Sequence, residues 1–204
     1  MTEMADIVYE FGGSLYLNIT NECPCKCVFC VRDIKDTMGT GENMWHEKTP
    51  SFEEIKAAID ASEISQYKSV VFCGYGEPTC EFENLIKTAK YIKENYGLKI
   101  RVNTNGLGSL YNGRDIAAEL CENVDSVSVS LNAPDKEKYL KITRNVFGID
   151  SFDAMLDFTK KCVECGADVR MTVVDILKED EIEKCAEIAK SVGAKFDARS
   201  YIKE

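Results

Sequence analysis

The sequence predicts an α/β protein shaped as an open, partial (β/α)6 barrel, TIM-like but not closed, with parallel strands and helices outside. Strand-like and helix-like stretches alternate along the chain, as they do in βαβ units. Several strands alternate between apolar and polar residues, which indicates one face packed on helices and one wet, concave face. A closed eight-stranded barrel would require two more units than this chain provides.

The predicted strands are short runs rich in Val, Ile, Leu and Tyr. In the fourth of them, Val127 and Val129 share one face while Ser128 and Ser130 share the other. Because active sites of such barrels lie at the carboxyl ends of the strands, residues at those ends are the first candidates for function. The six strands are expected at Leu15–Thr20, Ser69–Cys73, Lys99–Thr104, Asp125–Leu131, Asp168–Val174 and Lys195–Tyr201.

The predicted helices lie between these strands. The first begins with a capping-box pattern, because Ser51 is a favourable N-cap residue and Glu54 follows three residues later. Apolar residues then recur at helical spacing, which indicates a buried stripe. The five helices are expected at Ser51–Glu63, Glu81–Tyr96, Gly113–Asn123, Ser151–Cys165 and Glu179–Val192.

Composition limits the setting in which the protein works. At 204 residues and 45% hydrophobic content, the chain is expected to form one domain over residues 1–204. Its start does not resemble a secretory signal and no apolar run approaches a membrane span, so we expect a cytoplasmic protein without a membrane partner. The net charge of −10 opposes broad binding to nucleic acid. In such a chain, ten cysteines indicate metal ligation plus buried thiols.

Four of the cysteines lie together in a loop of about residues 21–48 that directly follows the first strand. They are Cys23, Cys25, Cys27 and Cys30, and they therefore lie at the edge of the sheet where barrel chemistry is expected. Thiolates suit both zinc and iron-sulfur clusters. Structural zinc sites usually draw two pairs of ligands from separate segments, and this segment has no obvious second pair.

The spacing Cys23-x3-Cys27-x2-Cys30, with the aromatic Phe29 before the last cysteine, resembles the cluster motif of the radical SAM superfamily. This resemblance implies that three cysteines hold an oxygen-sensitive 4Fe-4S cluster and that S-adenosylmethionine (SAM) binds its open iron. Cys25 is assigned as a non-ligand, although a fourth thiolate filling the open iron is an alternative. A non-catalytic iron-sulfur or zinc-binding electron-transfer module is the alternative for the whole loop.

Other strand ends carry further likeness to this superfamily. The segment Cys73-Gly-Tyr-Gly-Glu-Pro-Thr79 resembles its Gly-Gly-Glu motif, with Tyr75 in place of the first glycine, and Asn103-Thr-Asn-Gly106 resembles its Thr-Asn-Gly strand end. An ordinary turn, a solvated strand or a core position would explain each of them separately. The resemblance assigns SAM contacts to Phe29, Gly76, Glu77, Thr104, Asn105, Ser130, Asn132 and Val174.

Within the superfamily, the chain is most similar to a short group associated with TatD-type nucleases. The implied reaction takes an electron from reduced flavodoxin or ferredoxin, cleaves SAM reductively, and uses the 5′-deoxyadenosyl radical to abstract hydrogen from a substrate. The runner-up within the family is an activase or a peptide-modifying enzyme. The substrate itself is not identified by the sequence.

Three arginines are candidates for binding an anionic substrate inside the barrel. Arg101, Arg170 and Arg199 alternate onto the polar face of their strands, and surface ion pairing, for example with Asp197, is the alternative. Arg144 is a further candidate for binding a carboxylate.

The segment from Val31 to Pro50 is longer than a typical connection between a strand and a helix, which suggests a lid. It contains Trp45 and His46, and we expect His46 to be solvated.

Overall fold

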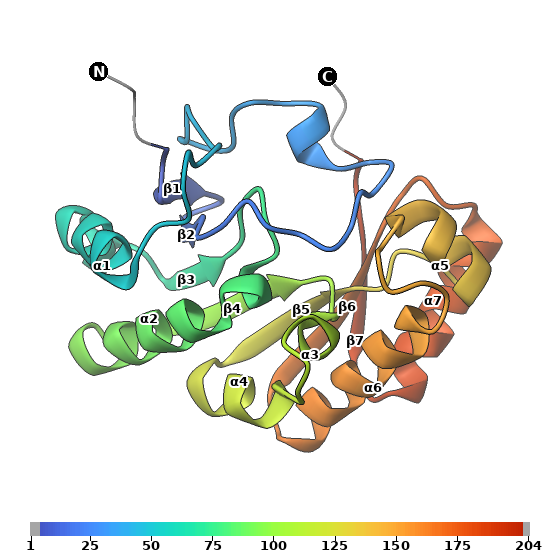
Figure 1. The fold of residues 1–204 in the computed structure, drawn as a ribbon. Coiled ribbons are helices and arrows are strands. Elements are labelled where there is room, and N and C mark those ends of the chain that lie inside the picture. Colours follow the sequence, from blue (N-terminus) through green and yellow to red (C-terminus); the bar gives the residue numbers. More distant parts are fainter. Residues whose placement is uncertain (1–4, 202–204) are drawn as a thin grey trace.

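A computed structural model of the chain describes residues 5–201 and contains one seven-stranded sheet with the order β1-β2-β3-β4-β5-β6-β7 (Figure 1). All neighbouring pairs are parallel except β1 and β2. The first and last strands are not paired with each other, which confirms the open barrel. The strands are β1 Val8–Phe11, β2 Ser14–Leu17, β3 Ser69–Phe72, β4 Lys99–Thr104, β5 Ser126–Ser130, β6 Asp168–Val174 and β7 Lys195–Arg199.

Strand β1 is an addition to the six predicted strands. It forms a hairpin with β2 through Gly12 and Gly13, whose φ angles are +58° and +77°. Two consecutive glycines with positive φ suit the tight hairpin turns that match the twist of a sheet. The two glycines in the sequence therefore indicated a hairpin, but the prediction placed the first strand at Leu15 and did not include β1.

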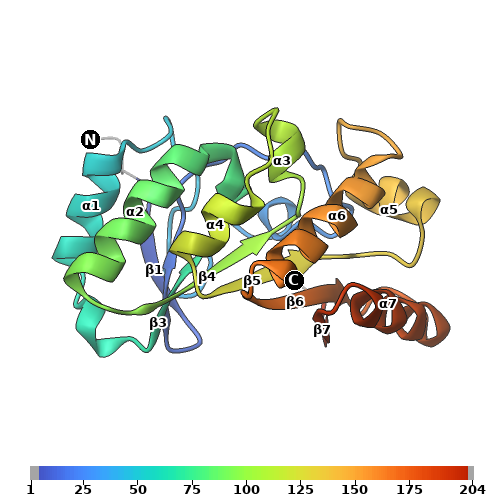
Figure 2. The same cartoon turned by 90° about the horizontal axis from the view of Figure 1, so that it is seen from below.

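The helices cover the outer face of the sheet, with α1, α2, α4 and α6 side by side in Figure 2. The capping box of Ser51 and Glu54 is present at the start of α1. Helices α3 and α5 were not predicted, and α4 starts at Ala117 because Gly113, with φ +63°, lies in a turn. The helices are α1 Phe52–Ala61, α2 Phe82–Asn95, α3 Gly108–Tyr111, α4 Ala117–Asn123, α5 Lys136–Thr143, α6 Ser151–Glu164 and α7 Glu179–Ser191, with short 3-10 helices at Val31–Asp33, Ile64–Gln66 and Pro78–Glu81.

The two faces of the sheet have different surroundings. The main apolar core lies between the strands and the helices. On the opposite face, a second and smaller cluster consists of Tyr9, Tyr16, Met44, Val71 and Tyr75. The concave face is therefore aromatic near β1 to β3 and polar along β4 to β6, rather than polar throughout. Within residues 5–201, no helix has the length and apolar character needed to cross a membrane.

Candidate active site

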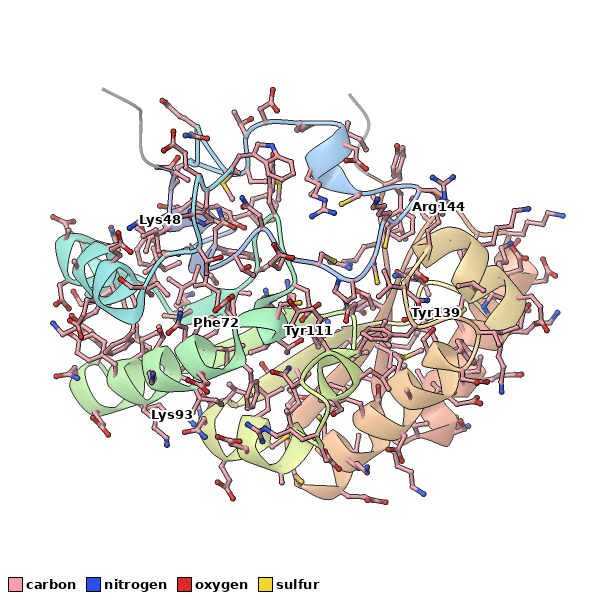
Figure 3. The ribbon with its side chains drawn as sticks, viewed as in Figure 1. Lys48, Phe72, Lys93, Tyr111, Tyr139 and Arg144 are labelled. Carbon is pink, nitrogen blue, oxygen red and sulfur yellow. The ribbon has the colours of Figure 1, made fainter. Side chains whose placement is uncertain are left out.

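The cysteine loop leaves β2 and crosses the carboxyl ends of the strands. Hydrogen bonds to the segment that ends α5 fix its backbone: Lys26 N donates to Thr143 O at 2.9 Å, and Val28 N donates to Ile142 O at 3.0 Å. Val146 N donates in return to Pro24 O at 3.0 Å. Figure 3 shows Arg144 of this segment at the edge of the loop. The unpredicted helix α5 thus supports the loop that carries the cysteines.

The four thiols of the loop lie in two different environments. Cys25 is 2% exposed and belongs to the main core, whereas Cys23, Cys27 and Cys30 are half-buried. Hydrogen bonding to the thiols of Cys23 and Cys27, together with burial, raises the pKa of Cys25, and the bond from Cys25 lowers the pKa of Cys23. Cys25 therefore lies next to two of the predicted ligands, and its assignment as a non-ligand stays a prediction.

The donor set of the loop suits an iron-sulfur cluster by its chemistry. Three half-buried thiols at the strand ends can supply thiolate ligands, which iron-sulfur clusters prefer. Within residues 5–201, no three His, Cys, Asp or Glu side chains gather around a single point as ligands of one metal ion. Cys23, Cys27 and Cys30 remain the predicted ligands of a cluster.

Glu77 lies at the centre of the site and is 4% exposed. Its Oε1 accepts hydrogen bonds from Thr79 N at 3.1 Å, Thr79 Oγ1 at 2.7 Å and Thr104 Oγ1 at 2.7 Å, and its Oε2 accepts one from Asn105 N at 2.6 Å. Burial raises the pKa of Glu77, while these hydrogen bonds oppose the rise. The carboxylate therefore joins the ends of β3 and β4 to each other.

Asn105 connects this carboxylate to the cysteine loop. Its backbone N–H donates to Glu77, and its side-chain Nδ2 lies 3.6 Å from Cys25 Sγ and 3.9 Å from Cys23 Sγ as a donor. Its Oδ1 accepts from Leu107 N at 2.8 Å, which fixes the orientation of the amide. Three motifs that are far apart in the sequence meet at this one residue.

Two glycines allow the motif that contains Glu77 to approach the cysteine loop closely. A Cβ atom at Gly76 would lie 2.3 Å from Thr20 O and 2.8 Å from Glu22 O, and one at Gly74 would lie 2.1 Å from Asn18 Oδ1. Glu77 N also donates to Glu22 O at 2.8 Å. The absence of a side chain at these two positions therefore allows close packing against the protein's own loop, and the SAM contact of Gly76 stays a prediction.

Several buried polar atoms lack a hydrogen-bond partner among the described residues. They include Arg101 Nε and Thr172 Oγ1 on the sheet, Asn132 Oδ1 just after β5, and Tyr139 Oη in the main core. Thr172 pairs in register with the predicted contact Ser130, so their side chains share a face. Asn132 has a φ of +61°, which is unusual for a residue with a side chain. Because buried polar groups normally have a hydrogen-bond partner, these unpaired atoms fit the binding of a polar ligand such as SAM.

Two of these residues were not predicted. Thr172 alternates onto the same face of β6 as Arg170, so the strand pattern could have identified it. Tyr139 lies on α5, whose eight residues are too few to show a clear helical pattern of apolar residues. Tyr139 is fully buried, and besides burial the thiols of Cys25 and Cys27 raise its pKa. Of the other predicted SAM contacts, Phe29 and Val174 are half-buried.

The strand register places the three candidate arginines on the concave face, as predicted. Ser128 of β5 pairs with Arg170 of β6 and with Asn103 of β4. Arg101 lies two residues before Asn103 and so points to the same face of the sheet. Arg101 Nη2 donates to Tyr16 Oη at 3.0 Å. Arg170 forms an ion pair with Asp197, which is the alternative that the sequence left open. Arg199 pairs in register with Val174.

The segment from Val31 to Pro50 is tied to the strand ends. Arg32 Nη1 donates to Tyr75 O and Asn21 O, both at 3.1 Å, and its guanidinium stacks 5.8 Å from the centre of the Trp45 ring. The expectation that His46 is solvated was wrong: it is half-buried, and its Nε2 hydrogen-bonds Asn18 O at 2.8 Å. Burial lowers the pKa of His46, so the ring stays neutral and anchors this segment.

Two cavities lie near the site. One of about 460 Å³ adjoins the cysteine loop and is lined by Cys27, Val28 and Trp45, by the basic residues Lys26, Arg32 and Arg144, and by the acidic residue Asp33. Another of about 700 Å³ lies between β1 and α1, and no residue of the three motifs lines it. The smaller cavity is therefore the one that bears on the chemistry of the cysteine loop.

Comparison with known proteins agrees with this geometry. The radical SAM superfamily matches residues 17–190. The chain belongs to this superfamily. Its members are enzymes, and a 4Fe-4S cluster and SAM are their characteristic cofactors. The match spans the sheet from β2 into α7 and so includes the cysteine loop, Glu77 and Asn105. The likeness to the TatD-associated group stays a prediction.

Relatives of known sequence and structure extend the comparison. The "Probable GTP 3′,8-cyclase" of Thermococcus kodakarensis is 30% identical over 88% of this chain and 54% of the relative. The protein of the same name from Pyrococcus abyssi is 28% identical over 92% of this chain and 57% of the relative. This radical SAM chain thus spans about half the length of these relatives. Streptococcus suis SuiB bound to S-adenosylmethionine shares the fold, with a TM-score of 0.70 and 15% identity over 95% of this chain and 42% of SuiB.

Proposed function

We propose that this protein binds a 4Fe-4S cluster through Cys23, Cys27 and Cys30 and cleaves SAM reductively to give a 5′-deoxyadenosyl radical. The observation that carries the proposal is the contact of Asn105 with both Glu77 and the cysteine loop. It brings three motifs to one point at the strand ends, where barrel enzymes hold their reactants. The cluster would supply the electron chemistry, and the protein would orient and shield the reactants.

The residues around this point have separate tasks. Glu77 and Asn105 hold the strand ends and the loop in register, and the backbone around Gly76 is the proposed partner of the methionyl amino group. Ser130, Asn132 and Thr172 offer polar atoms to the rest of SAM, and Asn132 and Thr172 each have a buried oxygen without another partner among residues 5–201. Phe29 and Val174 are the proposed contacts to the adenine.

The deciding experiment is anaerobic. The protein is reconstituted with iron and sulfide, given SAM and dithionite, and analysed for 5′-deoxyadenosine. We expect the absorbance of a 4Fe-4S cluster and formation of 5′-deoxyadenosine that requires both SAM and the reductant. An intact cluster without product would support an electron-carrier module instead, and zinc in the native protein would contradict both functions.

We further propose that the substrate is an anionic small molecule, with GTP as the first candidate. The relatives that are named GTP 3′,8-cyclases support GTP as the first molecule to test. Arg101 carries a buried Nε without a partner in the described part of the chain, on the same face as the polar strand ends. Arg199 is an exposed residue on the edge strand β7. Arg170 contributes less, because Asp197 already pairs with it.

Substitution of Arg101 tests this substrate class. We expect Arg101→Ala to weaken GTP binding about tenfold, which corresponds to about 1.4 kcal/mol for a lost charged contact. Calorimetry on the reconstituted protein measures the affinity. Arg114→Ala is the matched control, because Arg114 is an exposed arginine paired with Glu119 outside the barrel. Equal GTP affinity in wild type and Arg101→Ala, or no GTP binding at all, would contradict this assignment.

The electron donor is proposed to be a reduced flavodoxin or ferredoxin in the cytoplasm. Lys26 and Arg144 are exposed beside Cys27, and both line the smaller cavity. Positive side chains at this place would attract an acidic donor although the chain as a whole has a net charge of −10.

A further inference from the structure

Cys73 is a thiol on the concave face that the proposed binding of cluster and SAM does not use. It follows Phe72, which pairs with Val102 in β4, so its neighbour across the sheet is Asn103. Figure 3 shows Phe72 on the side of helix α2. Because side chains alternate along a strand, Cys73 points to the other face. It lies four residues before Glu77, at the start of the motif that resembles Gly-Gly-Glu.

The surroundings of this thiol combine the aromatic cluster of the concave face with polar groups. Cys73 is half-buried, whereas Cys80, Cys162 and Cys185 are buried. Against the larger effect of burial, the side chain of Asn103 and the charges of Arg199 and Arg101 each lower the pKa of the Cys73 thiol. Cys73 packs against the aromatic cluster, and it also faces the same side of the sheet as the arginines proposed to bind the substrate.

The position of Cys73 is fixed by the aromatic cluster on the concave face. Tyr9 Oη donates to Cys73 O at 3.0 Å, and Cys73 N donates to Leu17 O at 3.0 Å. The ring of Tyr9 lies 5.3 Å from that of Tyr16. Tyr16 in turn accepts the hydrogen bond from Arg101. The backbone of Cys73 and the guanidinium of a candidate substrate-binding arginine are therefore both held by the aromatic cluster.

The protonation state of Cys73 agrees with a role as a hydrogen donor. Burial raises the pKa of its thiol, and the side chain of Asn103 and the two arginines offset this only in part. The group therefore carries its proton near neutral pH, where a nucleophilic cysteine would be a thiolate.

We propose that Cys73 donates a hydrogen atom to a carbon radical formed inside the barrel. The inference rests on the proposed radical chemistry and adds a residue to it. In this step the S–H bond breaks and a C–H bond forms, because the S–H bond of a thiol is weaker than most C–H bonds. The remaining thiyl radical takes one electron from the low-potential donor and one proton from water, which restores the thiol.

The test needs no identified substrate, because SAM cleavage without substrate leaves the deoxyadenosyl radical to take hydrogen from the nearest donor. The reconstituted protein, SAM and dithionite are incubated in deuterated water, in which thiol hydrogens exchange and carbon-bound hydrogens do not. Mass spectrometry measures the fraction of 5′-deoxyadenosine that carries one deuterium. Because it is a fraction, it is informative even in a variant with lower activity.

We expect monodeuterated product from the wild type and a severalfold lower deuterated fraction from Cys73→Ser, which keeps the size and hydrogen bonding of the side chain but has a stronger O–H bond. Cys165→Ser, at an exposed cysteine at the end of α6, is the control and should match the wild type. An undiminished fraction in Cys73→Ser would overturn the inference alone. Absence of any 5′-deoxyadenosine would contradict the proposed function as well.

A second measurement uses the wild-type protein, so it does not depend on how the variant folds. A nitrone spin trap present during SAM cleavage adds to a thiyl sulfur, and peptide mass spectrometry locates the adduct. We expect the adduct on Cys73. Formation of 5′-deoxyadenosine with adducts only on other residues would overturn the assignment.

Discussion

Cys27→Ala is expected to lose the 4Fe-4S cluster and all SAM cleavage, whereas Cys25→Ala is expected to keep both. Cys27 is half-buried and lines the smaller cavity, and it is one of the three predicted ligands of the cluster. Cys25 is 2% exposed and packs in the main core next to Cys23 and Cys27, so the variant tests the prediction that this buried thiol is not a ligand. Removing its sulfur should cost about 1–2 kcal/mol of the free energy of unfolding, as for a small deletion in a core. Iron content, cluster absorbance and 5′-deoxyadenosine distinguish the two variants.

Cys25→Ala is also compared with Cys185→Ala, which controls for the loss of any buried thiol. Cys185→Ala removes another fully buried cysteine far from the loop and should behave like Cys25→Ala. Loss of the cluster in Cys25→Ala, with retention in Cys185→Ala, would show that Cys25 is a ligand. A fourth thiolate would then occupy the iron to which SAM is proposed to bind. That result would contradict the proposed cleavage of SAM.

The sequence was most informative where a motif coincided with the end of a strand. Cys23, Glu77 and Asn105 were each proposed from short motifs, and the structure brings all three into one hydrogen-bonded group. Parallel strands explain this success, because their carboxyl ends meet at one edge whatever the length of the helices between them. Their contact was thus predictable, although its geometry was not.

The parts that were missed depend on contacts between distant segments. Helix α5 has only eight residues, and its main role, supporting the cysteine loop through Ile142 and Thr143, is invisible in its own pattern. The hairpin strand β1 was overlooked although Gly12 and Gly13 indicated the turn.

Two individual side chains show the same limit. The neutral state of His46 comes from burial against β2, and the ion pair of Arg170 comes from the adjacent strand β7. Both depend on which segments become neighbours in space. A local pattern identifies such a residue as polar and gives no sign of its partner.

Glu77→Gln should weaken SAM binding about tenfold, while the fold as a whole is retained. All the hydrogen-bonding neighbours that the structure gives the carboxylate are donors: the N–H and hydroxyl of Thr79, the hydroxyl of Thr104 and the N–H of Asn105. A glutamine has one oxygen, so in either orientation its NH2 group faces a donor and leaves it unpaired. A buried donor without a partner costs about 1–3 kcal/mol.

The glutamine oxygen keeps three hydrogen bonds when it takes the place of Oε1, so its NH2 group then faces Asn105 N, whose 2.6 Å bond to Glu77 is lost. If Asn105 moves, its side chain loses the thiols of Cys23 and Cys25 and the strand end shifts away from the loop. Equilibrium binding of SAM to the reconstituted protein measures the effect, and thermal unfolding reports the stability of the fold. Glu83→Gln, an exposed glutamate on α2, is the matched control and should leave SAM affinity unchanged. Equal SAM affinity in Glu77→Gln and wild type would mean that Glu77 has no part in forming the site.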